Sequence, residues 1–388
     1  MSKTVFLCVA AVVASLAGVS AWAQTPSKLP GVIYWAAGDV GAYMYAAPAI
    51  IAEKIAPVLG SKIRLIPGND VERVNMMRTG RAHLGALSAD VYWASMGLAH
   101  YSTFALGPQP LRLVWSGWAN YGGSTGIATQ ASGVKTPHDL KGKRVAVVVG
   151  AAWSSEGVKG TLAFGNLTLK DVTVVEVSTT GAAGKALTEG KADFTMLGTN
   201  TPGVYELQAS SFGVTIVRYP HEDKAAWARY RTYMPYHVPG FSSVGAGIKP
   251  GDSIPTPQYP YPLTAALASQ PDDFVYAVCK AFYAKMDEIA AAYPGNDAMK
   301  PERAIVPEAT VMAPFHPGAI KFFKEVGLWK EAHERANQKK LAHLEKVNRR
   351  WAAFAEEAQD RIAKTGKKVD LGKEWREIVE KEVGLVAE

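Results

Sequence analysis

Two stretches of the chain alternate short apolar runs, rich in branched residues, with longer runs in which apolar residues recur every three or four positions. In the first stretch, this pattern predicts strands at residues 31–35, 62–67 and 83–87 and helices at residues 45–58 and 71–79. In the second, it predicts strands at residues 144–149, 172–177 and 193–197 and helices at residues 155–164 and 182–189. A strand, helix, strand rhythm of this length builds parallel sheet with crossover helices. The predicted fold class is therefore α/β, with two lobes and a cleft between them.

The segments between these units predict how the chain passes from lobe to lobe. Residues 111–118 and 124–130 have the pattern of extended segments, and we expect them to cross between the lobes. Residues 249–262 contain five prolines, which are incompatible with a regular helix or a central strand. We predict a loop there that returns the chain to the first lobe. The resulting division is residues 24–121 with 263–388 (lobe I) and residues 122–262 (lobe II).

Helical patterns resume at Asp272 and continue to the end of the chain. On the longest of them, apolar residues at spacings of three and four form one stripe on an otherwise charged helix. The stripe consists of Leu344, Val347, Trp351, Phe354, Ala358 and Ile362. The polar face mixes lysine, arginine and glutamate, whereas a helix that lies on a membrane usually has a basic polar face. We expect a C-terminal helical extension that packs along the outside of the lobes as a brace.

The amino terminus has the pattern of an export signal. Lys3 precedes an apolar run over residues 5–19, and residues 21–23 read Ala-Trp-Ala, a small-x-small cleavage site. A membrane anchor would need about 20 unbroken apolar residues, and this run is shorter. We expect a signal peptide over residues 1–23, cleavage after Ala23 and a periplasmic mature protein.

Composition limits the function classes. Cys8 lies inside the predicted signal, so the mature chain keeps Cys279 alone and cannot form an internal disulfide. The chain is 48% hydrophobic and 20% charged, which is typical of a globular protein with a packed core. Its net charge is +7, but the basic residues do not cluster with interleaved aromatic residues as they do in nucleic-acid-binding proteins. We expect no nucleic-acid partner and a monomeric protein.

The chain lacks the motifs that usually carry catalysis. It has no HExxH, GxSxG, Walker A or CxxC sequence, and its eight histidines do not have ligand spacing. His333 and His343 lie on the charged helix, where we expect them to be exposed. The sequence at residues 38–41, Gly-Asp-Val-Gly, lacks the third glycine of a dinucleotide loop. We predict that the protein is not an enzyme and binds neither a metal nor a cofactor.

One block of sequence resembles a known family. Residues 316–327, which begin His-Pro-Gly-Ala, are similar to the closing signature of the TAXI family, the solute-binding subunits of one class of TRAP transporters. Weaker blocks that resemble the same family precede it, in the family's order, at residues 67–72, 80–85 with Asp90, 139–145, 186–193 and 271–276. Together the blocks extend from about Gly31 to Trp329.

This resemblance implies a two-lobed extracytoplasmic receptor that closes on a small solute and delivers it to a TRAP membrane permease. Known members of the family bind small carboxylates such as glutamate. Closure needs no catalytic group, because main-chain N–H groups at helix N-termini and a few side chains can hold the solute. Three alternatives stay open: an ABC-transporter binding protein of the same fold, an exported enzyme, and a structural or adhesive envelope protein.

The resemblance also implies where the solute contacts lie, although this chain departs from the family pattern there. The expected contacts are Asp39, Tyr43, Tyr45, Asp70, Arg73, Asp90, Trp153, Ser154, Ser155, Asn200 and Thr201. Asp70 has an alternative role as the cap of a helix that starts at Val71. Arg73 is either a carboxylate clamp or a solvated helix residue. Trp153 is expected in a loop that forms the cleft wall. The choice between solute contact and helix capping or packing also applies to Tyr43, Tyr45, Ser154, Ser155, Asn200 and Thr201.

These departures predict the chemistry of the solute. Asp39, Asp70 and Trp153 stand where the family has small or neutral residues. A buried aspartate favours a hydrogen-bond donor, whereas it would repel a second carboxylate or become protonated beside it. We therefore expect a solute with an amine, hydroxyl or aromatic part beside any carboxylate.

Overall fold

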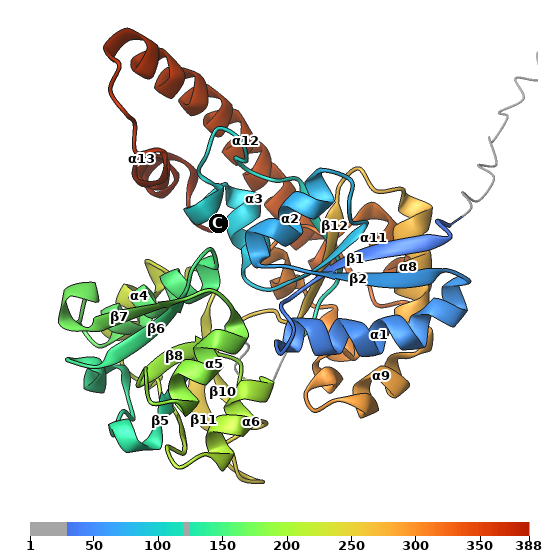
Figure 1. The fold of residues 1–388 in the computed structure, drawn as a ribbon. Helices are drawn as coiled ribbons and strands as arrows, with labels where there is room; N and C mark the ends of the chain where they lie inside the picture. The colour runs from blue at the N-terminus through green and yellow to red at the C-terminus, as the bar shows by residue number, and fades with distance from the viewer. Residues whose placement is uncertain (1–28, 119–123, 388) are drawn as a thin grey trace, which may run out of the picture.

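The computed structural model describes residues 29–118 and 124–387. Two α/β lobes lie side by side, and a pair of C-terminal helices projects from one of them (Figure 1). The predicted α/β class with two lobes and a C-terminal helical extension is confirmed. The predicted signal peptide and its cleavage site after Ala23 lie outside the described residues.

Lobe I is built on a mixed five-stranded sheet in the order β2-β1-β3-β12-β4. Its strands are β1 (Val32–Ala37), β2 (Lys62–Pro67), β3 (Leu84–Leu87), β4 (Leu111–Trp115) and β12 (Leu263–Leu267). β1 is parallel to β2 and β3, and β12 is antiparallel to β3 and β4. The helices of this lobe include α1 (Tyr43–Leu59), α2 (Asp70–Arg78), α3 (Asp90–Met96), α8 (Asp272–Ala284), α9 (Met286–Ala292) and α11 (Pro317–Glu325).

Lobe II repeats this plan with the order β7-β6-β8-β5-β9. Its strands are β5 (Thr125–Thr129), β6 (Arg144–Val148), β7 (Thr173–Val177), β8 (Phe194–Leu197) and β9 (Val214–Ile216). Its helices are α4 (Ala152–Phe164), α5 (Thr180–Thr188), α6 (Pro202–Ala209) and α7 (Lys224–Arg231). β6 is parallel to β7 and β8, as the predicted strand, helix, strand rhythm requires. α4 begins three residues before the predicted start, so Trp153 lies in its first turn and not in a loop.

The proline-rich segment differs from the prediction. It contains a strand, β11 (Ile254–Gln258), which pairs antiparallel with β10 (Val238–Ser242) in a separate two-stranded ribbon. A two-stranded ribbon leaves one edge of each strand without a partner, so prolines on that strand cost few ladder hydrogen bonds. The loop prediction was therefore wrong for residues 254–258. β12 follows and returns the chain to the lobe I sheet, but the exact lobe boundaries stay a prediction.

The His-Pro-Gly-Ala block shapes the packing of α11. His316 precedes the helix and its Nδ1 accepts a hydrogen bond from the Gly318 amide at 3.2 Å. A Cβ atom at Gly318 would lie 2.1 Å from the carbonyl oxygen of Asp272, at the start of α8. Only glycine allows this close approach of the two helix starts. The strongest motif of the sequence therefore has a structural role in lobe I.

The C-terminal extension consists of α12 (Glu331–Thr365), α13 (Leu371–Ile378) and a π-helical turn (Val379–Val383). The apolar stripe of α12 faces α13, and the rings of Phe354 and Trp375 stack at 5.7 Å. Trp375 is fully buried and donates from Nε1 to the Met96 carbonyl of lobe I at 3.0 Å. In Figure 1, α12 projects beyond lobe I and α13 folds back beside α3. Trp351, in the middle of the stripe, also lies against Gly107 of lobe I, so the stripe both joins α12 to α13 and packs α12 against lobe I.

The two histidines of α12 are buried, so the prediction that they are exposed was wrong. Nε2 of His333 lies 2.9 Å from the Ile305 carbonyl oxygen, and Nε2 of His343 lies 3.0 Å from that of Gly384. Both contacts are with segments distant in sequence, which helical periodicity cannot reveal. None of the helices in residues 29–118 and 124–387 is long and apolar enough to cross a membrane.

Candidate functional site

A cavity of about 50 Å³ lies between the two lobes. From lobe I it is lined by Gly38, Asp39, Ala42, Tyr43, Met44, Asn69, Asp70, Arg73 and Ser88, and from lobe II by Ser124, Val148, Ala151, Trp153, Thr180, Leu197, Gly198 and Thr201. Tyr259 and Tyr261, from the segment that returns the chain to lobe I, complete the wall. The carboxyl ends of β1, β3, β6 and β8 all lead into this lining, which is where open α/β sheets bind ligands.

Helix N-termini from both lobes converge on the cavity. The residues that flank or begin five helices line it: Ala42 (α1), Asn69 (α2), Ala151 (α4), Thr180 (α5) and Thr201 (α6). The N-cap residues of α1, α4 and α6 make no capping hydrogen bond through their side chains. The first N–H groups of a helix lack intrahelical partners and carry the positive end of its dipole. The cavity is therefore suited to an anionic or hydrogen-bond-accepting group.

Asp70 is the central charged residue of the lining. It is buried and forms an ion pair with Arg73, which also donates to the Ala86 carbonyl. Ser88 Oγ lies 3.4 Å from the same carboxylate. The capping role considered for Asp70 belongs to Asn69, whose side chain accepts from the Glu72 amide at 2.9 Å. Asp70 is thus the first residue of α2, and its carboxylate lines the cavity instead of capping the helix.

Trp153 connects the two lobes. It lies in the first turn of α4, and its Nε1 donates to Asp70 Oδ2 at 2.8 Å. The side chain is buried and lines the cavity. Because α4 belongs to lobe II and α2 to lobe I, this hydrogen bond exists only while the two helix starts face each other.

Asp39 also lies between the lobes. Burial raises the pKa of its carboxyl above the usual value, while Arg73 and a hydrogen bond from the Thr180 amide of lobe II act in the opposite direction. The net direction is upward. Asp39 is only partly buried. Unlike Asp70, the other carboxylate of the lining, it forms no ion pair with Arg73.

Asp90 lies beneath the cavity rather than in its lining. It is fully buried at the start of α3. Burial and the nearby charge of Asp70 raise the pKa of its carboxyl well above the usual value. A neutral carboxyl group supports the wall without adding a second negative charge beside Asp70.

The lining includes six of the eleven predicted contacts: Asp39, Tyr43, Asp70, Arg73, Trp153 and Thr201. It does not include Tyr45, Asp90, Ser154, Ser155 or Asn200. Ser154 Oγ accepts from the Val148 amide at 2.9 Å, and Ser155 Oγ lies 3.5 Å from the Ala152 carbonyl oxygen. Both serines therefore have local partners within lobe II. The Tyr43 hydroxyl donates to Asn296 Oδ1 at 2.8 Å.

Sequence reasoning missed the polar groups from the crossing segments. Ser124 Oγ and the Tyr259 hydroxyl are buried, line the cavity and have no hydrogen-bond partner among the described residues. Tyr259 and Tyr261 alternate with prolines in the return segment, and this pairing of aromatic and rigid residues was the available signal. Among the described residues, no group of three or more His, Cys, Asp or Glu side chains is placed to hold a metal ion.

Two α/β lobes thus line one cavity between them. The chain belongs to the NMT1-like family, whose model matches residues 37–327. Among solved structures, it is similar to an ancestral arginine-binding protein bound to glutamine, with 14% identity, TM-score 0.43, and coverage of 68% of this chain and 98% of that one.

Two further solved structures have comparable similarity. One is the alkanesulfonate-binding protein from Xanthomonas axonopodis pv. citri bound to MOPS, with 16% identity, TM-score 0.41, and coverage of 80% of this chain and 84% of that one. The other is a protein from Bordetella bronchiseptica RB50, with 18% identity, TM-score 0.43, and coverage of 80% of this chain and 98% of that one.

Proposed function

We propose that the protein is an extracytoplasmic receptor that captures one small organic solute, with a carboxylate or similar anionic group, between its lobes and delivers it to a membrane transporter. The observation that supports this most strongly is the convergence of five helix N-termini from both lobes on one interlobe cavity. Main-chain N–H groups there would hold the anionic group without a lysine or arginine dedicated to it.

The charged side chains of the lining support a solute that also carries a donor. The Arg73 guanidinium is paired with Asp70, which leaves it less available to bind a carboxylate of the solute. Asp39 has no such ion pair and would accept a hydrogen bond from an amine or hydroxyl of the solute. The Ser124 and Tyr259 hydroxyls offer two further polar contacts. Asp39, Tyr43, Asp70, Trp153 and Thr201 are our proposed contacts.

The cavity volume supports a small solute. A buried water molecule needs about 10–15 Å³ of such space, so 50 Å³ corresponds to roughly three to five water molecules. A compact amino acid or hydroxy acid would fit after small movements of the lobes, whereas an oligopeptide or a nucleotide would require an open cleft. The closed arrangement therefore supports solutes of low molecular mass.

The type of membrane transporter is a separate part of the proposal, because receptors of TRAP and ABC transporters share this fold. The motif series ending in the His-Pro-Gly-Ala block favours a TRAP-type permease driven by an ion gradient. An ABC-type permease is the alternative. Solute uptake by membrane vesicles with the purified receptor would separate them: collapse of the ion gradient abolishes TRAP uptake, whereas loss of ATP abolishes ABC uptake.

Native mass spectrometry of the purified mature protein tests the proposed receptor. We expect one retained small solute per chain, and readdition of that solute should stabilise the stripped protein. At a hundredfold excess over the dissociation constant, the gain is about 2.7 kcal/mol. A protein that retains no solute and is not stabilised by any small carboxylate, amino acid or hydroxy acid would contradict the proposal, as would chemical conversion of the bound solute.

A further inference from the structure

The C-terminal extension is anchored to lobe I and lies outside the matched family region, which ends at residue 327. Trp375 of α13 donates to the Met96 carbonyl, and the Tyr92 hydroxyl of α3 donates to the Leu385 carbonyl at 2.6 Å. These two contacts join α13 and the residues after it to α3. The extension therefore moves with lobe I.

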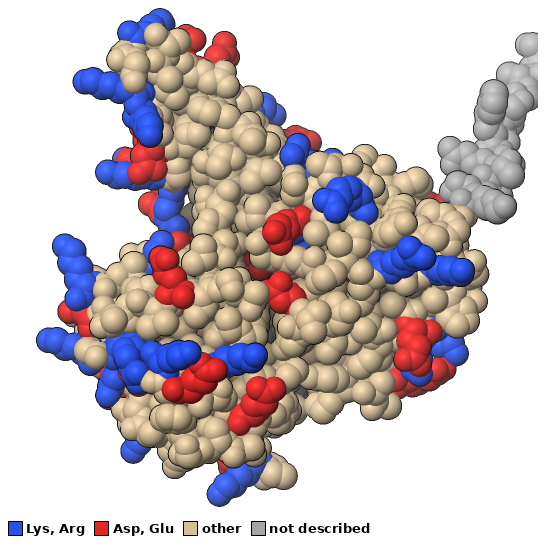
Figure 2. Space-filling view, in the orientation of Figure 1, with Lys and Arg blue, Asp and Glu red and all other residues tan. Residues whose placement is uncertain are grey.

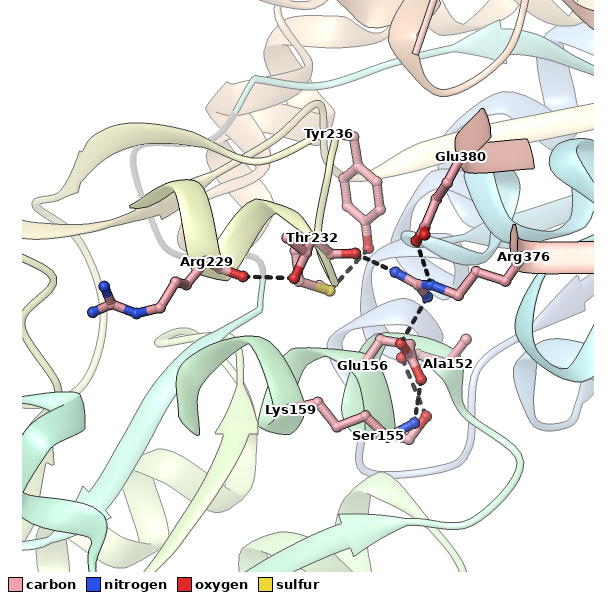
Figure 3. Close-up of polar contacts among 10 residues, drawn as sticks. Ala152, Ser155, Glu156, Lys159, Arg229, Thr232, Tyr236, Arg376 and Glu380 are labelled. Atoms are coloured by element: carbon pink, nitrogen blue, oxygen red, sulfur yellow. Dashed lines mark hydrogen bonds and ion pairs between the residues drawn. The ribbon is translucent and has the colours of Figure 1, made fainter. Parts of the chain in front are cut away.

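One side chain of the extension reaches lobe II. Arg376 of α13 places Nη1 3.3 Å from Glu156 Oε2 of α4 and also donates to the Thr232 carbonyl after α7 (Figure 3). Its guanidinium carbon lies 5.7 Å from the centre of the Tyr233 ring. Glu380, one turn later on the extension, holds the other edge of the guanidinium, with its Oε1 2.9 Å from Nε. The contacts of Arg376 with Glu156, Thr232 and Tyr233 thus join the extension to lobe II.

The contacted helix, α4, also contributes its start to the cavity wall. Glu156 follows Trp153 by three residues on α4, so both lie in adjacent turns of one helix end. The Glu156 side chain is 8% exposed and that of Arg376 is 25% exposed, so water screens this pair less than the mixed charges on the open surface in Figure 2. Lys159 also contacts Glu156, at 2.6 Å, but it belongs to α4 itself and cannot join the lobes.

We propose that Arg376 is a positioning residue that favours the closed arrangement of the lobes and raises solute affinity from outside the cavity. The affinity part rests on the proposed receptor function. The contact joins residues 220 positions apart in two lobes, so rotation of lobe II away from the extension breaks it. An interaction present only in the closed state shifts the population toward that state. A larger closed population lowers the apparent dissociation constant in proportion.

Distance measurement on solute-free protein tests this directly. Spin labels on cysteines introduced at the exposed Lys62 (lobe I) and Lys170 (lobe II) report lobe separation by pulsed dipolar spectroscopy, and the buried Cys279 stays unlabelled. We expect R376Q to lower the ratio of closed to open molecules by about fivefold relative to wild type. R376K should retain part of the effect, and the charge exchange R376E/E156R should restore it in part.

Arg350 provides the matched control, because it pairs with Glu357 and Glu382 within the extension and not with lobe II. R350Q should leave the distance distribution unchanged. Identical distributions for R376Q and wild type would overturn the proposal, whether both are closed or both open, even if R376Q melts at a lower temperature. The measurement uses no solute, so a protein that closes through Arg376 but retains no solute would contradict the receptor function alone.

Discussion

Asp70 and Trp153 show at the residue scale how the two lobes meet. They are 83 residues apart in the sequence and share a hydrogen bond of 2.8 Å across the cavity. The sequence marked both residues as departures from a family pattern, and both line the cavity. It left helix capping open as an alternative role for Asp70, because an aspartate before an apolar run is a good N-cap. Asn69 is an equally good N-cap one position earlier, and local sequence cannot choose between them.

The first prediction concerns the Trp153 indole. Changing Trp153 to phenylalanine removes the donor to Asp70 while keeping an aromatic wall, so the closed arrangement loses one hydrogen bond to a charged group. We expect the retained solute to bind about tenfold more weakly, which corresponds to about 1.4 kcal/mol. Calorimetry with W227F as the control measures this, because Trp227 donates to Pro220 within lobe II. Equal loss of affinity in both variants would contradict the account.

The second prediction concerns the ion pair of the lining. Changing Asp70 to asparagine leaves Arg73 buried without its counter-charge, since both side chains are 4% exposed. Removing one partner of such a pair costs about 3–5 kcal/mol of unfolding free energy. D273N is the control, because Asp273 pairs with Lys321 at the surface, where a pair contributes about 0–1 kcal/mol. Urea unfolding that gives D70N a loss no larger than that of D273N would show that the pair is not buried in solution.

At the scale of helices and strands, periodicity predicted well where the regular elements lie, but it predicted poorly which other segments they contact. The strands of both lobes form where branched apolar runs occur, because a sheet covered on both faces selects such residues. The β10-β11 ribbon was missed because prolines usually exclude strands, and an isolated ribbon is the exception. The exposure of His333 and His343 was mispredicted for a similar reason. Their partners are 28 and 41 residues away, and the pattern of one helix carries no information about them.

The third prediction concerns Lys340, a buried lysine of α12. Lys340 donates to the Val311 carbonyl at 2.9 Å and lies 5.5 Å from the Tyr92 ring, with His343 one turn away. Burial lowers its pKa from 10.5 to about 7. Between these values the unfolded chain holds a proton that the folded protein has lost, so unfolding free energy rises with pH through this window.

Replacement of Lys340 by methionine should therefore flatten the rise in unfolding free energy between pH 7 and pH 9. Chemical denaturation at several pH values measures the slope. K346M is the control, because Lys346 is exposed on the same helix and should keep the wild-type slope. A K340M slope equal to that of wild type would mean that Lys340 does not titrate in this range.

The two lobes, the return of the chain through β12 and the helical extension define the whole molecule. The alternation of strands and helices predicted two lobes because each unit is long enough to build its own sheet. The way the lobes face each other could not be predicted. It depends on pairs such as Asp39 with the start of α5 and Arg376 with Glu156, whose members are scattered along the chain. Five helix N-termini meet between the lobes only because both sheets direct their carboxyl ends to the same space.

A crystal structure of the mature protein purified with its retained solute tests the central claim most directly. The account predicts electron density for one small solute in the interlobe cavity, with its anionic group in hydrogen-bonding distance of the N–H groups that begin α1, α4 or α6. An amine or hydroxyl of the same solute should face Asp39. Density for a solute bound elsewhere, with the cavity between Asp70 and Trp153 filled only by water, would contradict it.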